Sequence, residues 1–408
     1  MALSAAAATA GLESQLAYIR HDRDVTHAYS PAVGRLYDLA VNYVHDAEEA
    51  YQRGEKEVWV MGLWEVPLIY ATDTIPVSFT ELGRLGSADS ITVAEDHFQI
   101  PRETCSMISA ILGEWWLRKD SGIRKVLAFN AACEPFNMAW ELIKAEGFEI
   151  HRIDTVYLPA EVGPERFEDL VAFLTHELRE AGKWLSGGEL DTARVAVEIK
   201  RRNRILAKVR RILALRFENP LYIRSLATMY LLMGSGHYLG QPEAFESVLD
   251  ELLVEMESAA LIPSPSGKPV VPILWCGGRG QEFGVYQAVD DCGAAILGWM
   301  TPNSFARDYR EDIDPVESLA RYYLDGQLAG ASVHRRKILT HQLASSKARG
   351  ILFYNYVGCS FGGVTLEMER AHFHEKGIPS ICLEGTFQVG PPSGQLLTRV
   401  RAFVEMLS

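Results

Sequence analysis

Short apolar runs alternate with helical patterns in two separate stretches of the chain, and this alternation constrains the fold more than any other feature of the sequence. The runs are rich in β-branched and aromatic residues, which is typical of buried strands. The predicted strands are EVWVMG (57–62), the end of EVPLIYATDTIPV (65–77) and KVLAFN (125–130) in the first stretch, and VVPILWCG (270–277), AAILGWM (294–300), GILFYNY (350–356) and IPSICLEG (378–385) in the second. Alternating strands and helices predict parallel sheets, so we expect an α/β fold with two doubly wound domains.

Helical patterns occupy the rest of the chain. Four of them follow one another without a strand, at 165–184, 190–216, 223–232 and 243–260, and later ones are predicted at 281–292, 315–347, 362–376 and 393–407. The clearest linker is PSPSGKP (263–269), because its prolines forbid a continuing helix. We therefore expect four parts: an N-terminal helical arm (1–55), a first α/β domain (56–160), a helical segment (161–262) and a second α/β domain (263–408).

Composition excludes several classes of protein. The net charge of −13 argues against a nucleic-acid partner, which needs a clustered positive surface. The one basic cluster, at 200–211, is interleaved with apolar residues and predicts an amphipathic helix with a solvated basic face. No apolar run approaches the roughly 20 residues of a membrane span, and the N-terminus lacks the features of an export signal. Six cysteines without a regular framework fit a reducing compartment, so we expect a cytoplasmic protein.

Three of the cysteines lie where a helix is predicted to begin. Cys359 directly follows the strand GILFYNY, Cys133 follows KVLAFN in the first α/β domain, and Cys105 precedes the helix of SMISAILGEWW. A helix N-terminus favours a thiolate, because the free N–H groups of its first turn can donate to anionic sulfur. Three widely separated thiolates suit an iron–sulfur cluster with one iron left open, whereas zinc would prefer paired spacing such as CxxC. The alternative for each cysteine is a small buried residue.

The other cysteines have simpler explanations. Cys382 is predicted to be a buried strand residue, and Cys292 lies at a helix end before Gly293. Cys276 ends the strand PILWC, from which its side chain is able either to pack in the core or to face the same cleft as Cys359. We therefore expect Cys105, Cys133 and Cys359 to be the best candidate set.

At these residues the sequence resembles the iron–sulfur subunits of the 2-hydroxyacyl-CoA dehydratase and benzoyl-CoA reductase family. The likeness extends from about Glu57 to the C-terminus. Its motifs are VWVMGLWEVPLIYATDTIPV (58–77), the contexts TCS, ACE and GCS around Cys105, Cys133 and Cys359, Asn203-Arg204 followed by YLLM (230–233), ILWCGG (273–278), and IPSICLEGTF (378–387) followed by SGQLLTRVRAF (393–403).

The resemblance implies a function and a set of partners. In that family three cysteines of each subunit bind one 4Fe-4S cluster, so Cys105, Cys133 and Cys359 would be the cofactor-binding metal ligands. Two homologous subunits face each other, and a separate ATP-hydrolysing iron–sulfur activator protein injects an electron. The implied reaction is the removal of water from a 2-hydroxyacyl-CoA by ketyl-radical chemistry. The alternatives are a benzoyl-CoA reductase-type subunit, a homodimeric reductase with a larger cluster shared across the dimer, and a cluster-free α/β binding protein.

Several residues depart from the family's pattern or carry no fixed role. Glu134 stands where the family usually has aspartate, Ser360 follows the third cysteine in place of an acid, and Asp73 occupies a position usually given to glycine. Glu65 and Glu134 are the acids nearest to predicted strand ends and are candidate proton-handling residues, with helix capping as the alternative. The loop GGRGQEFG (277–284) is predicted to be a tight turn, with a cradle for a coenzyme A phosphate as the alternative.

Overall fold

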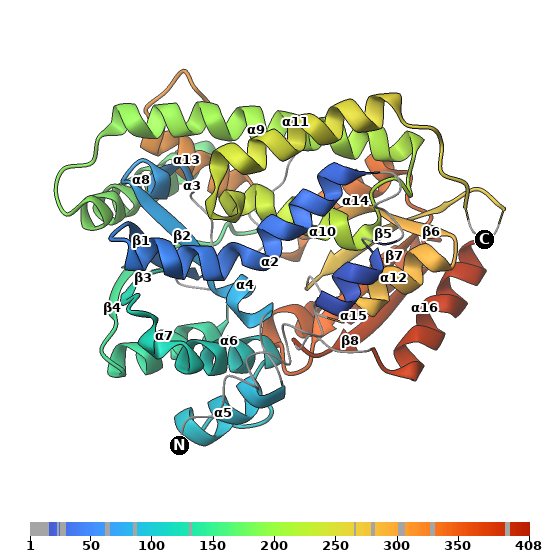
Figure 1. Cartoon of the computed structure of the whole chain (residues 1–408), viewed down its shortest axis with the longest axis horizontal. Coiled ribbons are helices and arrows are strands. Elements are labelled where there is room, and N and C mark those ends of the chain that lie inside the picture. Colours follow the sequence, from blue (N-terminus) through green and yellow to red (C-terminus); the bar gives the residue numbers. More distant parts are fainter. Residues whose placement is uncertain are drawn as a thin grey trace.

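Two parallel sheets form the framework of the protein (Figure 1). The computed structural model describes residues 16–22, 24, 30–61, 66–84, 88–129, 133–264, 267–278, 282–300, 307–326, 331–387 and 392–408. The first sheet contains β1 (Lys56–Met61), β2 (Thr74–Ser78), β3 (Lys125–Phe129) and β4 (Glu149–Ile153) in the order β2-β1-β3-β4. The second contains β5 (Val271–Gly277), β6 (Ala294–Met300), β7 (Gly350–Tyr356) and β8 (Ser380–Gly385) in the order β6-β5-β7-β8.

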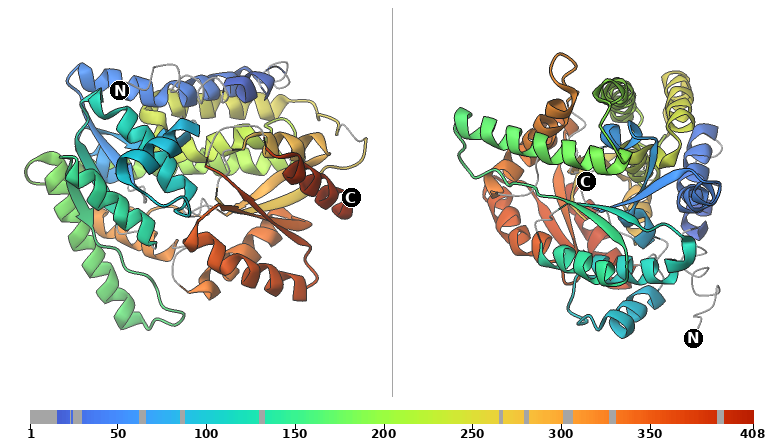
Figure 2. Two further views of the ribbon diagram at one scale, coloured as in Figure 1. Left: turned by 90° about the horizontal axis from the view of Figure 1, so that it is seen from below. Right: turned by 90° about the vertical axis from the view of Figure 1, so that its left-hand side faces the viewer.

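The two sheets have the same topology and lie in different halves of the molecule (Figure 2). All of their neighbouring strands pair in parallel. In each sheet the second strand pairs with one edge of the first strand and the third strand pairs with its other edge. The fourth strand lies outside the third. The predicted α/β fold with two doubly wound domains is therefore confirmed. The topology also makes β3 the counterpart of β7, so that Cys133 and Cys359 follow corresponding strands.

Helices cover both faces of each sheet. In the first half they are α2 (Pro31–Gln52), α3 (Val66–Tyr70), α4 (Phe79–Arg84), α5 (Ala88–Phe98), α6 (Ser106–Leu117) and α7 (Glu134–Ala145). In the second half they are α12 (Gly284–Asp291), α14 (Ser332–Ser346), α15 (Ser360–Glu375) and α16 (Gly394–Leu407). Helix α13 (Pro315–Asp325) follows β6 in the chain but packs in the first half, against α8 (Pro164–Ser186) and α9 (Thr192–Glu218). The predicted helix at 315–347 is wrong as a single element, because α13 ends at a cap on Gly326 and α14 starts anew at Ser332.

Successive side chains of the central strands point to opposite faces of the sheet and pack in different hydrophobic clusters, because helices cover both faces. In β1, Trp59 packs in one cluster, whereas Val58 and Val60 pack in another that includes α8 and α9 residues. In β5, Trp275 joins the large cluster, whereas Cys276 packs in a third one with Met300. The sheets are therefore buried on both faces and leave only their strand ends for chemistry.

The predicted helical segment between the sheets consists of α8 (Pro164–Ser186), α9 (Thr192–Glu218), α10 (Ser225–His237) and α11 (Pro242–Ser258). Helices α9 and α11 lie side by side at the top of Figure 1. The expected basic face of α9 is partly solvated, since Arg204 and Arg211 stay more than half exposed, and it also pairs with acids of α11: Arg201 with Glu243, Arg204 and Lys208 with Glu246, and Arg211 with Glu257. Arg210 of the same basic cluster pairs with Asp308 instead, and Arg202 is buried. None of the described helices is both long and apolar enough to cross a membrane.

Candidate functional site

Each of the three predicted cysteines occupies the residue directly before a helix. Cys105 is the N-cap of α6, Cys133 is the N-cap of α7 and Cys359 is the N-cap of α15. Cys105 is only 3% exposed, and the other two are half-buried. The sequence prediction that all three lie at helix starts is confirmed, and the first-turn N–H groups of three helices are available to anionic sulfur.

The loops that carry Cys105 and Cys359 are in direct contact, although they belong to different halves of the chain. The N–H of Ser106 donates to the carbonyl oxygen of Val357 at 2.9 Å. Gly358 approaches the Glu103–Thr104 peptide so closely that a Cβ on it would lie 2.5 Å from the carbonyl oxygen of Glu103. A backbone φ of 76° at Gly358 also favours glycine there. The two loops therefore fit together only with glycine directly before Cys359.

The three cysteines influence one another's pKa values. The Cys105 thiol donates a hydrogen bond to Cys359, which lowers the pKa of Cys359 to about 6 and raises the pKa of Cys105. Backbone N–H groups at the start of α15 also lower the pKa of Cys359, and the Gly362 N–H lies 3.3 Å from its sulfur. Burial raises the pKa of Cys133, and the nearby charge of Cys359 raises it further. Cys359 is thus the sulfur whose surroundings most favour a thiolate.

The remaining cysteines lie elsewhere. Cys276 is buried, with its sulfur 3.5 Å from that of Met300, so it faces the core and not the helix starts. Cys292 caps the C-terminus of α12, and Cys382 lies within β8 as predicted, although it is half-buried and not buried. Within the described part of the chain, no group of three or more His, Cys, Asp and Glu side chains is arranged to hold a single metal ion.

Of the two predicted proton-handling acids, Glu134 and Glu65, the structure describes only Glu134. Glu134 is exposed in the first turn of α7, where its charge raises the pKa of Cys133. Glu65 lies outside the described residues. Gly284 of the 277–284 segment begins α12 and packs against Pro392, whereas Gly277 and Gly278 pack against the backbone of Tyr354 and the ring of Tyr356. This close approach to β7 explains both glycines without a ligand.

Sequence reasoning missed Glu282 and Tyr354. Tyr354 lies in β7 and donates a hydrogen bond to Glu282 at 2.9 Å. The available signal was an acid shortly after a strand end, the same signal that identified Glu65. It was overlooked because the loop was interpreted through its glycines.

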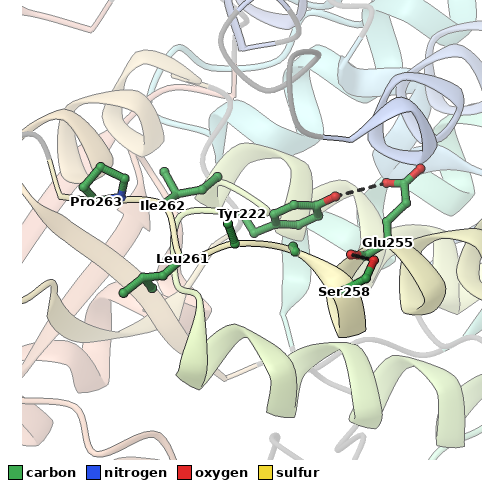
Figure 3. A pocket seen from close by; sticks show the side chains of 8 residues that line it. Tyr222, Glu255, Ser258, Leu261, Ile262 and Pro263 are labelled. Carbon is green, nitrogen blue, oxygen red and sulfur yellow. Dashed lines mark hydrogen bonds between the residues drawn. The ribbon is translucent and has the colours of Figure 1, made fainter.

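An open cavity of about 350 Å³ lies away from the cysteines, at the C-terminal end of α11 (Figure 3). Its polar groups bind one another: the Tyr222 hydroxyl donates to Glu255 at 3.4 Å, and Ser30 donates to the same carboxylate at 2.7 Å. Leu261, Ile262 and Pro263 supply an apolar wall. This carboxylate also accepts from the N–H of Ala32 at the start of α2, so the cavity borders a helix cap.

A protein-family model matches most of the chain. The sequence model of the family described as 2-hydroxyglutaryl-CoA dehydratase, D-component, matches residues 65–407. No curated protein matches the chain. The match includes all three helix starts that carry Cys105, Cys133 and Cys359.

Proposed function

Because the chain belongs to the 2-hydroxyglutaryl-CoA dehydratase D-component family, we propose that it is the cluster-bearing subunit of a 2-hydroxyacyl-CoA dehydratase. In this proposal Cys105, Cys133 and Cys359 hold a 4Fe-4S cluster. The observation that carries the proposal is the convergence of three helix N-caps, each a cysteine, on the contact between the two halves of the chain.

The residues present fit such a cluster. Three cysteines at separate helix starts match the three-thiolate donor set of a 4Fe-4S cluster that keeps one iron without a cysteine. Thiolate ligands need charge stabilisation, and the first-turn N–H groups of α15 supply it to Cys359. When bound, the cluster would supply one-electron transfer and, at its iron without a cysteine, a Lewis acid.

The chain's own residues have separate tasks. Cys105, Cys133 and Cys359 bind the cluster from three helix starts, so that both α/β halves contribute. Burial of Cys105 and the close fit of Gly358 on Glu103 and Thr104 exclude water from one side of the site. The other side is left for a 2-hydroxyacyl thioester, because ligands of doubly wound sheets bind at the carboxyl ends of the strands.

The family implies partnership with an activator and a second component. An exposed apolar row on α15 supports a protein partner near Cys359: Phe361 is 37% exposed, Val364 75% and Met368 52%. These residues follow a helical repeat on the outer face, where an isolated surface helix normally carries polar residues. We expect the ATP-hydrolysing activator or the second component to cover this row.

Metal analysis tests the proposal directly. The protein purified without oxygen should contain iron and sulfide and absorb visible light. Replacing Cys105, Cys133 or Cys359 by Ala should abolish that absorbance, because each removes a thiolate ligand. Cys292→Ala and Cys382→Ala are matched controls that should keep it. A colourless, iron-free wild-type protein would contradict the proposal and favour the cluster-free binding protein.

A further inference from the structure

Glu282 and Tyr354 form a hydrogen-bonded pair at the carboxyl edge of the second sheet. Glu282 follows β5, and Tyr354 is the fifth residue of β7. These are the two central strands, from which the chain turns to opposite sides of the sheet. In doubly wound folds the crevice at this switch point is the usual ligand site. The pair thus lies where a substrate is expected, and Tyr354 belongs to β7, the strand that leads to Cys359.

Close packing fixes the position of the pair. The Tyr354 hydroxyl is 2.9 Å from Oε2 of Glu282 and donates to it. Both groups lie over Gly385 at the end of β8, where any Cβ would overlap the hydroxyl and the carboxylate. Tyr354 is 1% exposed, whereas Glu282 is half-buried, so the phenol is held within the protein and the carboxyl retains an open side.

Hydrogen bonds connect this location to the cysteine loops. The carbonyl oxygen of Gly385 accepts from the N–H of Val357, two residues before Cys359. The N–H of Phe387 donates to the Ser106 hydroxyl, next to Cys105, at 3.2 Å. The strand end beneath Glu282 is therefore bonded to the segments that carry two of the three cysteines.

The surroundings of Glu282 favour a carboxyl that carries a proton. Burial raises its pKa, and the hydrogen bond from Tyr354 opposes that shift. Among the described residues, Tyr18 also faces it, and the pKa of Tyr18 is raised by burial and by the charge of Glu282. Burial and the carboxylate also raise the pKa of Tyr354, so it remains a phenol and a hydrogen-bond donor.

We propose that Glu282, oriented by Tyr354, is the catalytic residue that exchanges a proton with the substrate. This inference rests on the proposed dehydratase function. Removal of water from a 2-hydroxyacyl thioester breaks the C2–O bond and one C3–H bond and forms a C2–C3 double bond. The Glu282 carboxyl gives its proton to the departing oxygen, which leaves with the C–O electron pair as water. The proton lost from C3 returns the carboxylate to the acid, so the overall reaction involves no net oxidation or reduction.

Two substitutions and one control test the assignment in the anaerobically assembled enzyme. Glu282→Gln keeps the size of the side chain and removes its proton, Tyr354→Phe removes only the orienting hydroxyl, and Glu384→Gln changes an exposed acid one residue before Gly385. With 2-hydroxyglutaryl-CoA as the probe, Glu282→Gln should lower kcat by about 10²–10⁴-fold, the usual contribution of a positioned acid. Glu384→Gln should leave kcat within twofold of wild type, and iron content should be unchanged in all three variants.

An infrared titration provides a readout that does not need turnover. Wild-type protein should show the C=O band of a protonated carboxyl that Glu282→Gln abolishes. Tyr354→Phe should raise the pKa of this band, because the lost hydrogen bond favoured the carboxylate, and a merely structural tyrosine would not move it. A Glu282→Gln enzyme with turnover within threefold of wild type, or an unchanged band, would overturn the inference. An iron-free wild-type protein would instead overturn the proposed function, so the two failures are distinguishable.

Discussion

Replacing Gly358 by alanine should disturb the contact between the two cysteine loops. The backbone at Gly358 has a φ of 76°, and the left-handed region costs a residue with a Cβ about 1–2 kcal/mol. The new Cβ would also lie 2.5 Å and 2.8 Å from the carbonyl oxygens of Glu103 and Thr104. These are backbone atoms, so relief requires the loops to separate, at an overpacking cost of about 1–3 kcal/mol. The expected loss in the free energy of unfolding is therefore about 2–5 kcal/mol.

Gly377→Ala is the matched control for this substitution. Gly377 directly follows the cap of α15, at the opposite end of the helix from Cys359, and has a similar φ of 73°. A Cβ there would meet no heavy atom within 4 Å. The control therefore bears the conformational cost of about 1–2 kcal/mol without the clash. Any further loss in Gly358→Ala reports the contact between the loops.

Urea unfolding followed by tryptophan fluorescence, together with iron content, measures both consequences. Gly358→Ala should lose about 1–3 kcal/mol more than Gly377→Ala, and its iron content should fall because Cys359 moves away from Cys105. Equal losses in unfolding free energy, with equal iron content in the two variants, would refute the argument that Gly358 holds the loops together.

Two further predictions concern buried charges. Glu57 is 4% exposed, and neither of its carboxylate oxygens has a hydrogen-bond partner among the residues that the structure describes, so burial raises its pKa from 4.5 to about 8. The unfolded chain releases this proton at lower pH than the folded chain does. The free energy of unfolding should therefore decrease as the pH rises from about 4.5 to about 8, by at most about 1.4 kcal/mol per pH unit. Glu57→Gln should remove this slope in urea titrations at several pH values, and an unchanged slope would contradict the assignment. Arg335 lies 3.9 Å from the fully buried Glu369, so Arg335→Ala should lower the free energy of unfolding by about 3–5 kcal/mol and the added change Glu369→Gln should restore part of it. The control Arg370→Ala breaks an exposed pair and should cost at most about 1 kcal/mol, and equal losses for the two arginines would argue against a buried pair.

Local sequence patterns predicted much of the fold because the signals are local. The strands β5, β6 and β7 and the helices α8 to α11 occur close to the predicted residues. The edge strand β4 was not singled out, because EIHRI is mostly polar and only Ile153 is fully buried. The break between α13 and α14 was missed because no proline interrupts this part of the sequence, in which only Gly326 and Gly330 signal a break.

The candidate site also combines features that the sequence predicted with features that it did not. That Cys105, Cys133 and Cys359 begin helices was predictable, since a strand end or a capping residue precedes each helical pattern. The unusual Asp73 has a φ of 55°, which explains why glycine suits that turn in the family. The pairing of Glu282 with Tyr354 was not predictable, because the two residues lie 72 positions apart in the chain.

The sequence alone determined the α/β class, the positions of the helix starts and the family resemblance, because strand and helix periodicity, caps and short motifs are properties of neighbouring residues. Only the tertiary structure decided that the two sheets repeat one topology and that Gly358 fits against Glu103 and Thr104. It also decided that Cys105 donates to Cys359, and that the basic face of α9 pairs with α11. These contacts join residues that are distant in the chain, and a local pattern carries no information about which distant surface it will meet.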